Sequence, residues 1–201
     1  MQPTGPRAFQ LVLLRRMADF QPQLVDEARH ELGASRTEMR EANRRWQAML
    51  RSPRAPSGRR RYEALLGPAQ AGGRRAVGDL DCEWHRWPVP LWPDLRYEVV
   101  ALAGGPVLHE WLVRAEDAFA PRPRHVGELH PWSCVVEDVA RAFAPAVPME
   151  GTAPSRWRMA FCAADEAGAR GRYVADFTWG LLQRVLPADP AAGSGAGDAA
   201  G

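Results

Sequence analysis

The sequence has no lysine and no isoleucine, and Asn43 is its only asparagine. Because these three residues have AT-rich codons, we attribute their shortage to a GC-rich genome, so part of the arginine content is a coding bias. The three cysteines lack framework spacing, which argues against a disulfide scaffold and favours a reducing compartment. The apolar run near the start, Leu11–Leu14, is too short for a membrane span or a signal peptide. We therefore expect a cytoplasmic protein without a membrane segment.

The 201 residues suffice for one large domain or two small ones, and their charge is divided unevenly. Residues 1–80 contain 15 arginines and 8 acidic residues, a net charge of +7, whereas residues 81–201 contain 11 arginines and 16 acidic residues, a net charge of −5. Coding bias acts on both halves alike and cannot produce this difference. The division indicates two modules or two faces with different partners, and the basic half allows a nucleic-acid partner.

The N-terminal half has the apolar spacing of helices, which we expect over residues 7–20, 22–32 and 35–50. The last of these has the clearest start, because Ser35 and Glu38 form the pattern of a capping box. Its expected apolar face comprises Met39, Ala42, Trp46, Met49 and Leu50.

The C-terminal half alternates apolar and polar residues, as antiparallel strands do; Leu80, Cys82 and Trp84 form the expected buried side of the first strand. The predicted class is α+β, with a helical N-terminal part followed by a small antiparallel β-sheet with one or two packed helices. We expect strands over residues 80–87, 95–103, 107–114, 156–163 and 171–177, and helices over 133–144 and 178–186. The predicted organisation is a helical region (1–66), a linker (67–79), an α+β domain (80–186) and a disordered tail (187–201).

Residues 31–46, ELGASRTEMREANRRW, resemble the helix-turn-helix of GntR-type regulators, in which a turn glycine, here Gly33, precedes a Ser-Arg-Thr start of the recognition helix. The resemblance implies an alternative function, a DNA-binding transcriptional regulator with a helix-turn-helix at 22–50. An ordinary capped helical hairpin explains the same residues. The side chains that the resemblance places on phosphates and base edges are Ser35, Arg36, Thr37 and Arg40.

A further alternative is a cysteine-dependent enzyme. Cys134 falls in the first turn of the helix expected over 133–144, where the helix dipole lowers a thiol pKa, and His130 is near enough in sequence to act as a base. No phosphate-binding loop, nucleophile elbow or zinc-protease motif is present, and simple packing also explains this cysteine. We expect no metal, because Cys82 and His85 in one strand point to opposite faces.

Tryptophan is abundant, and seven of the eight lie in residues 81–201. The segment WHRWPVPLW is interrupted by prolines, which cannot sit in a central strand, so we expect an open sheet edge with exposed rings beside it. Such an edge can accept a peptide strand, and the acidic half favours a basic or neutral peptide. The expected peptide- or partner-binding residues are Trp84, His85, Trp87 and Trp92.

The leading hypothesis is therefore a non-catalytic binding or accessory protein that docks a peptide or partner protein through a Trp-rich sheet, without a cofactor. The layout, a helical part followed by a small antiparallel sheet, resembles accessory subunits that present precursor peptides to modifying enzymes. The partner of the iron-dependent oxidase in methanobactin biosynthesis is one of these. No sequence motif accompanies this resemblance.

Overall fold

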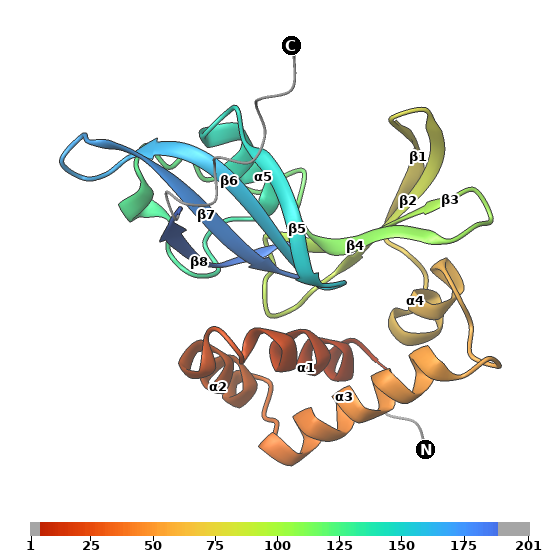
Figure 1. The fold of residues 1–201 in the computed structure, drawn as a ribbon. Coiled ribbons are helices and arrows are strands. Elements are labelled where there is room, and N and C mark those ends of the chain that lie inside the picture. The colour runs from red at the N-terminus through yellow and green to blue at the C-terminus, as the bar shows by residue number, and fades with distance from the viewer. Residues whose placement is uncertain (1–4, 189–201) are drawn as a thin grey trace, which may run out of the picture.

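The computed structural model describes residues 5–188, which form five α-helices and two four-stranded antiparallel sheets; the α+β class is confirmed. Figure 1 shows α1, α2 and α3 in a layer below the sheets. The helices are α1 (Pro6–Met17), α2 (Pro22–Glu31), α3 (Arg36–Arg51), α4 (Arg59–Leu66) and α5 (Val136–Ala142), with a 3₁₀ helix at Val126–Glu128. The first sheet comprises β1 (Ala71–Val77), β2 (Leu80–Pro88), β3 (Leu95–Leu102) and β4 (Val107–Arg114), and the second β5 (Val147–Ala153), β6 (Arg156–Ala164), β7 (Arg170–Thr178) and β8 (Leu181–Pro187), each paired in chain order.

Local sequence signals set the ends of the N-terminal helices. Gly33 follows α2 with a φ of 59°, a left-handed conformation that glycine adopts without strain. The Ser35 hydroxyl accepts a hydrogen bond from the Glu38 amide at 3.1 Å, and the Ser35 amide donates to the Glu38 carboxylate at 2.7 Å, so the predicted capping box is confirmed. Leu50 does not belong to the buried face of α3: it is 40% exposed, whereas Met49 packs on the core.

The helices and the first sheet share one hydrophobic core. Phe9 of α1 packs edge-on against Tyr97 of β3, with 4.7 Å between ring centroids, and against Trp46 of α3 at 5.7 Å. Tyr62 of α4 packs on Tyr97 at 5.6 Å, and Trp87 of β2 lies opposite Tyr97 in the strand register. These aromatic rings hold the helical layer against one face of the first sheet.

The expected linker over 67–79 is wrong for most of its length, because residues 71–77 form β1. The segment AGGRRAV has little intrinsic preference for a strand. Its conformation follows from pairing with β2, in a register that runs from Ala71 opposite Arg86 to Val77 opposite Leu80. Leu80 is 47% exposed, contrary to the expected buried side of β2, because it lies at the tip of this protruding hairpin.

The second sheet packs against α5 and differs from the expectation in three elements. Residues 147–153 form a strand, β5, that the sequence did not predict, and residues 181–187 form β8 where a helix was expected. Helix α5 begins at Val136 rather than at Ser133, because Asp138 accepts a hydrogen bond from the Val135 amide at 3.1 Å. Of the tail predicted to be disordered, residues 189–201 lie outside the described residues.

A tight turn connects the two sheets. Trp179 and Gly180 have φ angles of 53° and 76° and join β7 to β8, and the Trp179 carbonyl accepts a hydrogen bond from the Leu112 amide of β4 at 2.7 Å. A Cβ atom on Gly180 would lie 2.8 Å from the Trp111 Cβ and 2.9 Å from the Leu112 carbonyl oxygen. The position therefore requires glycine both for its backbone angles and for its contact with β4.

We expect Gly180→Ala to destabilise the protein more than Gly168→Ala. Both glycines have positive φ, but a Cβ on Gly168 would meet nothing within 4 Å. The control should cost about 1 kcal/mol of backbone strain, and Gly180→Ala about 2 kcal/mol more from overlap with β4. Urea unfolding measures both, and equal losses would show that the contact with β4 is unimportant.

Candidate functional site

The structure does not bring together the four residues that were expected to bind a peptide or partner. Trp87 is 1% exposed, and its indole nitrogen donates to the Gly67 carbonyl at 2.9 Å, so the expectation that it forms a surface pocket is wrong. Trp92 is half-buried and packs edge-on against Trp132, with 5.5 Å between ring centroids. The rings of both residues pack against the helix–sheet core.

Trp84 and His85 are neighbours in β2, and their side chains lie over opposite faces of the edge strand β1. A Cβ on Gly73 would lie 3.0 Å from the Trp84 indole nitrogen, and one on Gly72 would lie 2.8 Å from the His85 Nδ1. The indole therefore covers one face of β1 and the imidazole the other. Paired glycines opposite paired aromatic residues are the sequence signal that would have located this arrangement.

Strand β1 is an edge of the first sheet, and within residues 5–188 no other strand pairs with its outer side. Gly78 and Asp79 form the two-residue turn of the β1–β2 hairpin, so Val77 and Leu80 face each other as a hydrogen-bonded pair. Because amides alternate along a strand, those of residues 72, 74 and 76 point outward. The outer side of β1 thus offers a row of main-chain donors and acceptors.

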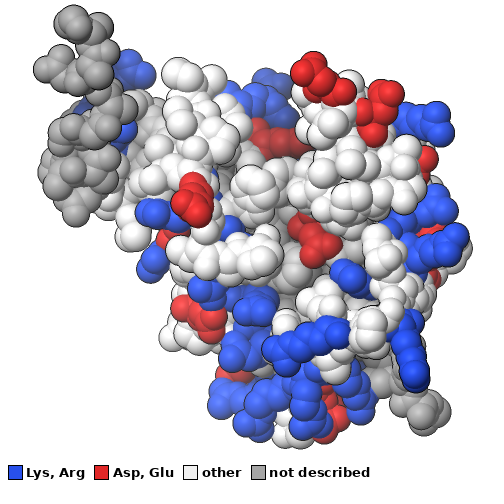
Figure 2. All heavy atoms as spheres, turned by 45° about the vertical axis from the view of Figure 1, so that its right-hand side comes forward, with Lys and Arg blue, Asp and Glu red and all other residues white. Residues whose placement is uncertain are grey.

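Two arginines lie on the edge strand itself: Arg74 is 3.7 Å from Glu83, and Arg75 pairs with Glu98. The side chain of Arg74 is 81% exposed, and that of Arg75 is 34% exposed. Arg59 of α4 lies near enough to His85 to disfavour its charged form: burial first, and then this arginine, lower the pKa of His85 below its ordinary value. Figure 2 shows arginine side chains gathered at the bottom of the view, at the height of α3 in Figure 1 and away from the β1–β2 hairpin at the top.

A buried carboxylate fixes the arginines behind this edge. Glu98 of β3 is fully buried, with Arg75 Nη2 2.6 Å and Arg86 Nε 2.8 Å from its oxygens and His109 Nε2 at 3.6 Å. Burial alone would raise the pKa of Glu98, but hydrogen bonds from His109, Arg75 and Arg86 hold it at about 2. The carboxylate is therefore ionised at neutral pH and orients both guanidinium groups across the sheet.

Aromatic rings accompany these charges on the same face. The Arg86 guanidinium lies over the Trp84 ring, 4.7 Å from its centroid. His109 and Trp111 of β4 are 4.4 Å apart between centroids, and Trp157 of the second sheet packs edge-on against Trp111 at 4.9 Å. We call Arg75, Trp84, Arg86, Glu98, His109 and Trp111 the outer face of the first sheet.

The opposite face of the sheet carries a second carboxyl group, that of the half-buried Glu110, next to α4. Burial raises the pKa of Glu110 to about 7, with Arg61 opposing the shift, and Tyr62 hydrogen-bonds to the same carboxyl group. Tyr97 nearby has a buried hydroxyl without a hydrogen-bond partner in the described chain. Polar groups are therefore present between α4 and the sheet, but they are enclosed by the aromatic core.

The residues expected to contact DNA interact mainly with neighbouring protein groups. Ser35 caps α3, Arg36 pairs with Asp26, and Thr37 accepts a hydrogen bond from Arg40 at 3.4 Å. The capping carboxylate of Glu38 occupies the helix N-terminus, where a phosphate would bind. A helix, α4, follows α3 where a winged regulator has a hairpin.

Cys134 has neither of the two features expected of a reactive thiol, a position in the first turn of a helix and His130 as a nearby base. Cys134 precedes α5 by two positions and is 1% exposed. Burial raises the pKa of its thiol, although the Ser133 hydroxyl, 3.6 Å from the sulfur, acts in the opposite direction. In the described part of the chain, no hydrogen bond joins the His130 side chain to this cysteine. The geometry gives no support to nucleophilic catalysis at this position.

Among residues 5–188, no three His, Cys, Asp or Glu side chains are grouped so that they could bind one metal ion. None of the helices described is long and apolar enough to cross a membrane. No protein-family model, curated protein or solved structure matches this chain, so the functional argument rests on the geometry of the β1 edge and the outer face.

We expect Trp87→Ala to lower the free energy of unfolding by about 3–5 kcal/mol, because it leaves a large cavity in the core. Trp84→Ala should cost much less, since that half-buried ring contacts the edge strand and the Arg86 guanidinium rather than the core. Urea unfolding of the two variants tests the assignment. A similar loss in both would place Trp84 in the core as well.

The raised pKa of Glu110 predicts a pH dependence of stability. The unfolded chain ionises this carboxyl group near pH 4.5, whereas the folded chain keeps its proton until about pH 7. Folding therefore becomes less favourable as pH rises between these values, by about 3 kcal/mol in total. Glu110→Gln removes this contribution, so the variant should gain stability relative to the wild type from pH 4.5 to 7. A constant difference between the two unfolding curves over that range would refute the assignment.

Proposed function

We propose that this chain is a non-catalytic peptide-binding protein, which adds an extended, acidic segment of a partner protein to its first sheet along β1. The observation that carries the proposal is the unpaired edge of β1, held between the rings of Trp84 and His85. Main-chain hydrogen bonds along the edge would supply affinity, and the two rings would contact alternate side chains of the added strand.

The charge of the edge favours an acidic partner segment rather than the basic or neutral one expected from the composition. Arg74, whose side chain is 81% exposed, lies on β1 itself with Glu83 3.7 Å away, and Arg59 approaches from α4, where Glu63 lies 3.2 Å from it. Glu98 is already neutralised by Arg75 and Arg86 and does not repel an incoming carboxylate. Arg59 and Arg74 belong to the basic N-terminal half of the sequence, so the net acidity of residues 81–201 does not describe this edge.

A protein of this kind acts as an accessory subunit. A peptide bound as an edge strand is held extended, and half of its side chains point away from any one face of the sheet. Those side chains remain accessible to a second protein, such as an enzyme that modifies the peptide. This role agrees with the expected accessory function and requires no catalytic group in the chain itself.

The proposal predicts that Ala76→Pro weakens peptide binding. The amide of residue 76 points outward, so proline removes one donor and obstructs the edge while the ladder to β2 stays intact. Binding of a fluorescein-labelled octapeptide that alternates glutamate with valine should weaken about tenfold, the effect of losing about 1.5 kcal/mol of main-chain hydrogen bonding. Ala76→Val is the matched control and should bind like the wild type.

A lysine version of the octapeptide and a DNA duplex complete the fluorescence-polarisation experiment. The glutamate peptide should bind more tightly than the lysine peptide, and its affinity should fall with added salt. Equal binding by Ala76→Pro and Ala76→Val would refute edge addition. Tight binding of the duplex, abolished by Arg36→Ala and Arg40→Ala, would instead favour the regulator hypothesis.

A further inference from the structure

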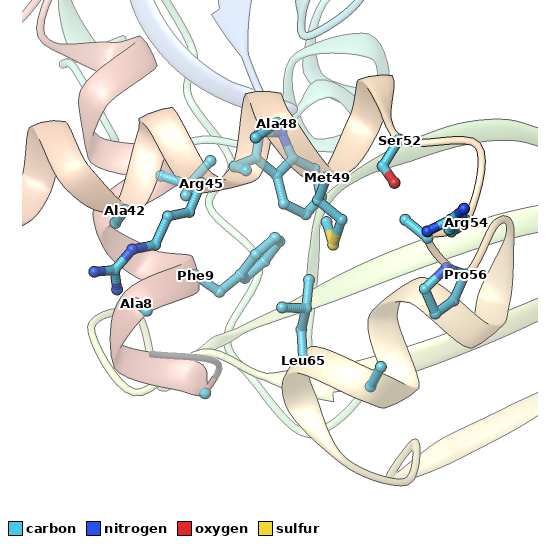
Figure 3. A pocket seen from close by; sticks show the side chains of 15 residues that line it. Ala8, Phe9, Ala42, Arg45, Ala48, Met49, Ser52, Arg54, Pro56 and Leu65 are labelled. Carbon is cyan, nitrogen blue, oxygen red and sulfur yellow. The ribbon is translucent and has the colours of Figure 1, made fainter. Parts of the chain in front are cut away.

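A second candidate site lies among the N-terminal helices, and no residue of β1 lines it. A cavity of about 730 Å³ opens between α1, the C-terminal half of α3, the 52–58 connection and α4. Figure 3 shows Phe9, Met49 and Leu65 pointing toward its centre from three different helices.

The cavity is apolar along its length and polar at one end. Its floor contains the buried side chains of Phe9, Val12 and Trp46. Ser52 and Arg54 lie together at the end formed by the connection to α4 (Figure 3). No aspartate or glutamate lines the cavity, so its net charge is positive.

The two arginines of the lining differ in their partners. Arg45 is paired with Glu41 of the same helix, at 3.1 Å. Arg54 makes no ion pair with any of residues 5–188, and the nearby Ser52 hydroxyl makes no hydrogen bond within them. Both residues are exposed and line the same cavity, and a guanidinium and a hydroxyl without partners can together bind one carboxylate.

We propose that this cavity binds an anionic amphiphile of the fatty-acid class, with the alkyl chain over Phe9, Met49 and Leu65 and the carboxylate at Ser52 and Arg54. Its volume falls within the range typical of small-molecule sites, which are mostly apolar with a few placed polar groups. The unpaired arginine at one end supplies the charge complementarity that selects an anionic head group. This site is separate from the β1 edge, so it stands or falls independently of the proposed peptide binding.

Calorimetric titration of the full chain with decanoate, dodecanoate and tetradecanoate, below their micellar concentrations, tests the proposal. Each added methylene group should tighten binding about fourfold until the cavity is filled, and each step of this series adds two. Decyltrimethylammonium has an alkyl chain one carbon longer than that of decanoate and a positive head group, and it should bind far more weakly.

Two variants localise the binding. Ala64→Trp places a large ring at an exposed lining position and should abolish binding, whereas Ala103→Trp, in the exposed β3–β4 turn, should not. Arg54→Gln should weaken dodecanoate binding about tenfold, the loss of one charge-assisted contact, without changing the dependence on chain length. Arg51→Gln, an exposed arginine outside the lining, is its matched control.

Thermal unfolding establishes that each variant is folded, and Arg54→Gln keeps the proposal testable if Ala64→Trp is not. Absence of binding by the wild type would overturn the proposal. Equal binding of the anionic and cationic amphiphiles would overturn the assigned head-group site, as would unchanged affinity in Arg54→Gln.

Discussion

The contact between the Trp179–Gly180 turn and β4 is the constraint on which the arrangement of the two sheets depends. The Trp179 carbonyl accepts the Leu112 amide, and the Gly180 carbonyl accepts the Val136 amide at 3.1 Å. One turn thus fixes the edge of the first sheet, the end of the second sheet and the start of α5. Its close approach is available only to glycine, so a single position determines how three elements meet.

Several arginine side chains stabilise this fold, although a coding bias accounts for part of their number. Arg75 and Arg86 neutralise Glu98 inside the first sheet, and Arg114 pairs with the buried Asp138 at 2.6 Å. A guanidinium stays charged at any physiological pH and can share one carboxylate with a second guanidinium. The same pairing extends to the β1 edge, where Arg74 lies 3.7 Å from Glu83. Arginine side chains of the first sheet are therefore largely engaged in pairs within the fold.

The elements that the sequence predicted correctly are those with local signals. The capping box of Ser35 and Glu38 is contained within one helical turn, and the β3–β4 hairpin has alternation and a glycine turn in its own segment. Residues 181–187 were mistaken for a helix because Leu181, Leu182 and Val185 match helical spacing. What decides their conformation is the preceding turn with two positive φ angles, which periodicity does not reveal.

The candidate site was only half predictable for a similar reason. Trp84 and Trp87 are three residues apart in β2, so their side chains lie on opposite faces: Trp87 on the face covered by the helices and Trp84 on the outer face. The open edge was expected at the proline segment, but β1 pairs outside β2 and becomes the edge instead. Since β1 has no strand propensity of its own, only the tertiary structure shows where the free main chain lies.

The unpaired β1 strand also has a consequence for the protein without its partner. A free edge is as good a template for a second copy of the same chain as for a peptide, and edge-to-edge pairing is the first step of aggregation. Within one copy, Arg74 lies 3.7 Å from Glu83 and Arg75 pairs with Glu98, so charge repulsion alone does not prevent such pairing. Two successive glycines, Gly72 and Gly73, weaken any strand formed there. The composition of this strand therefore disfavours self-association through its low strand propensity, while its edge stays open to a partner segment.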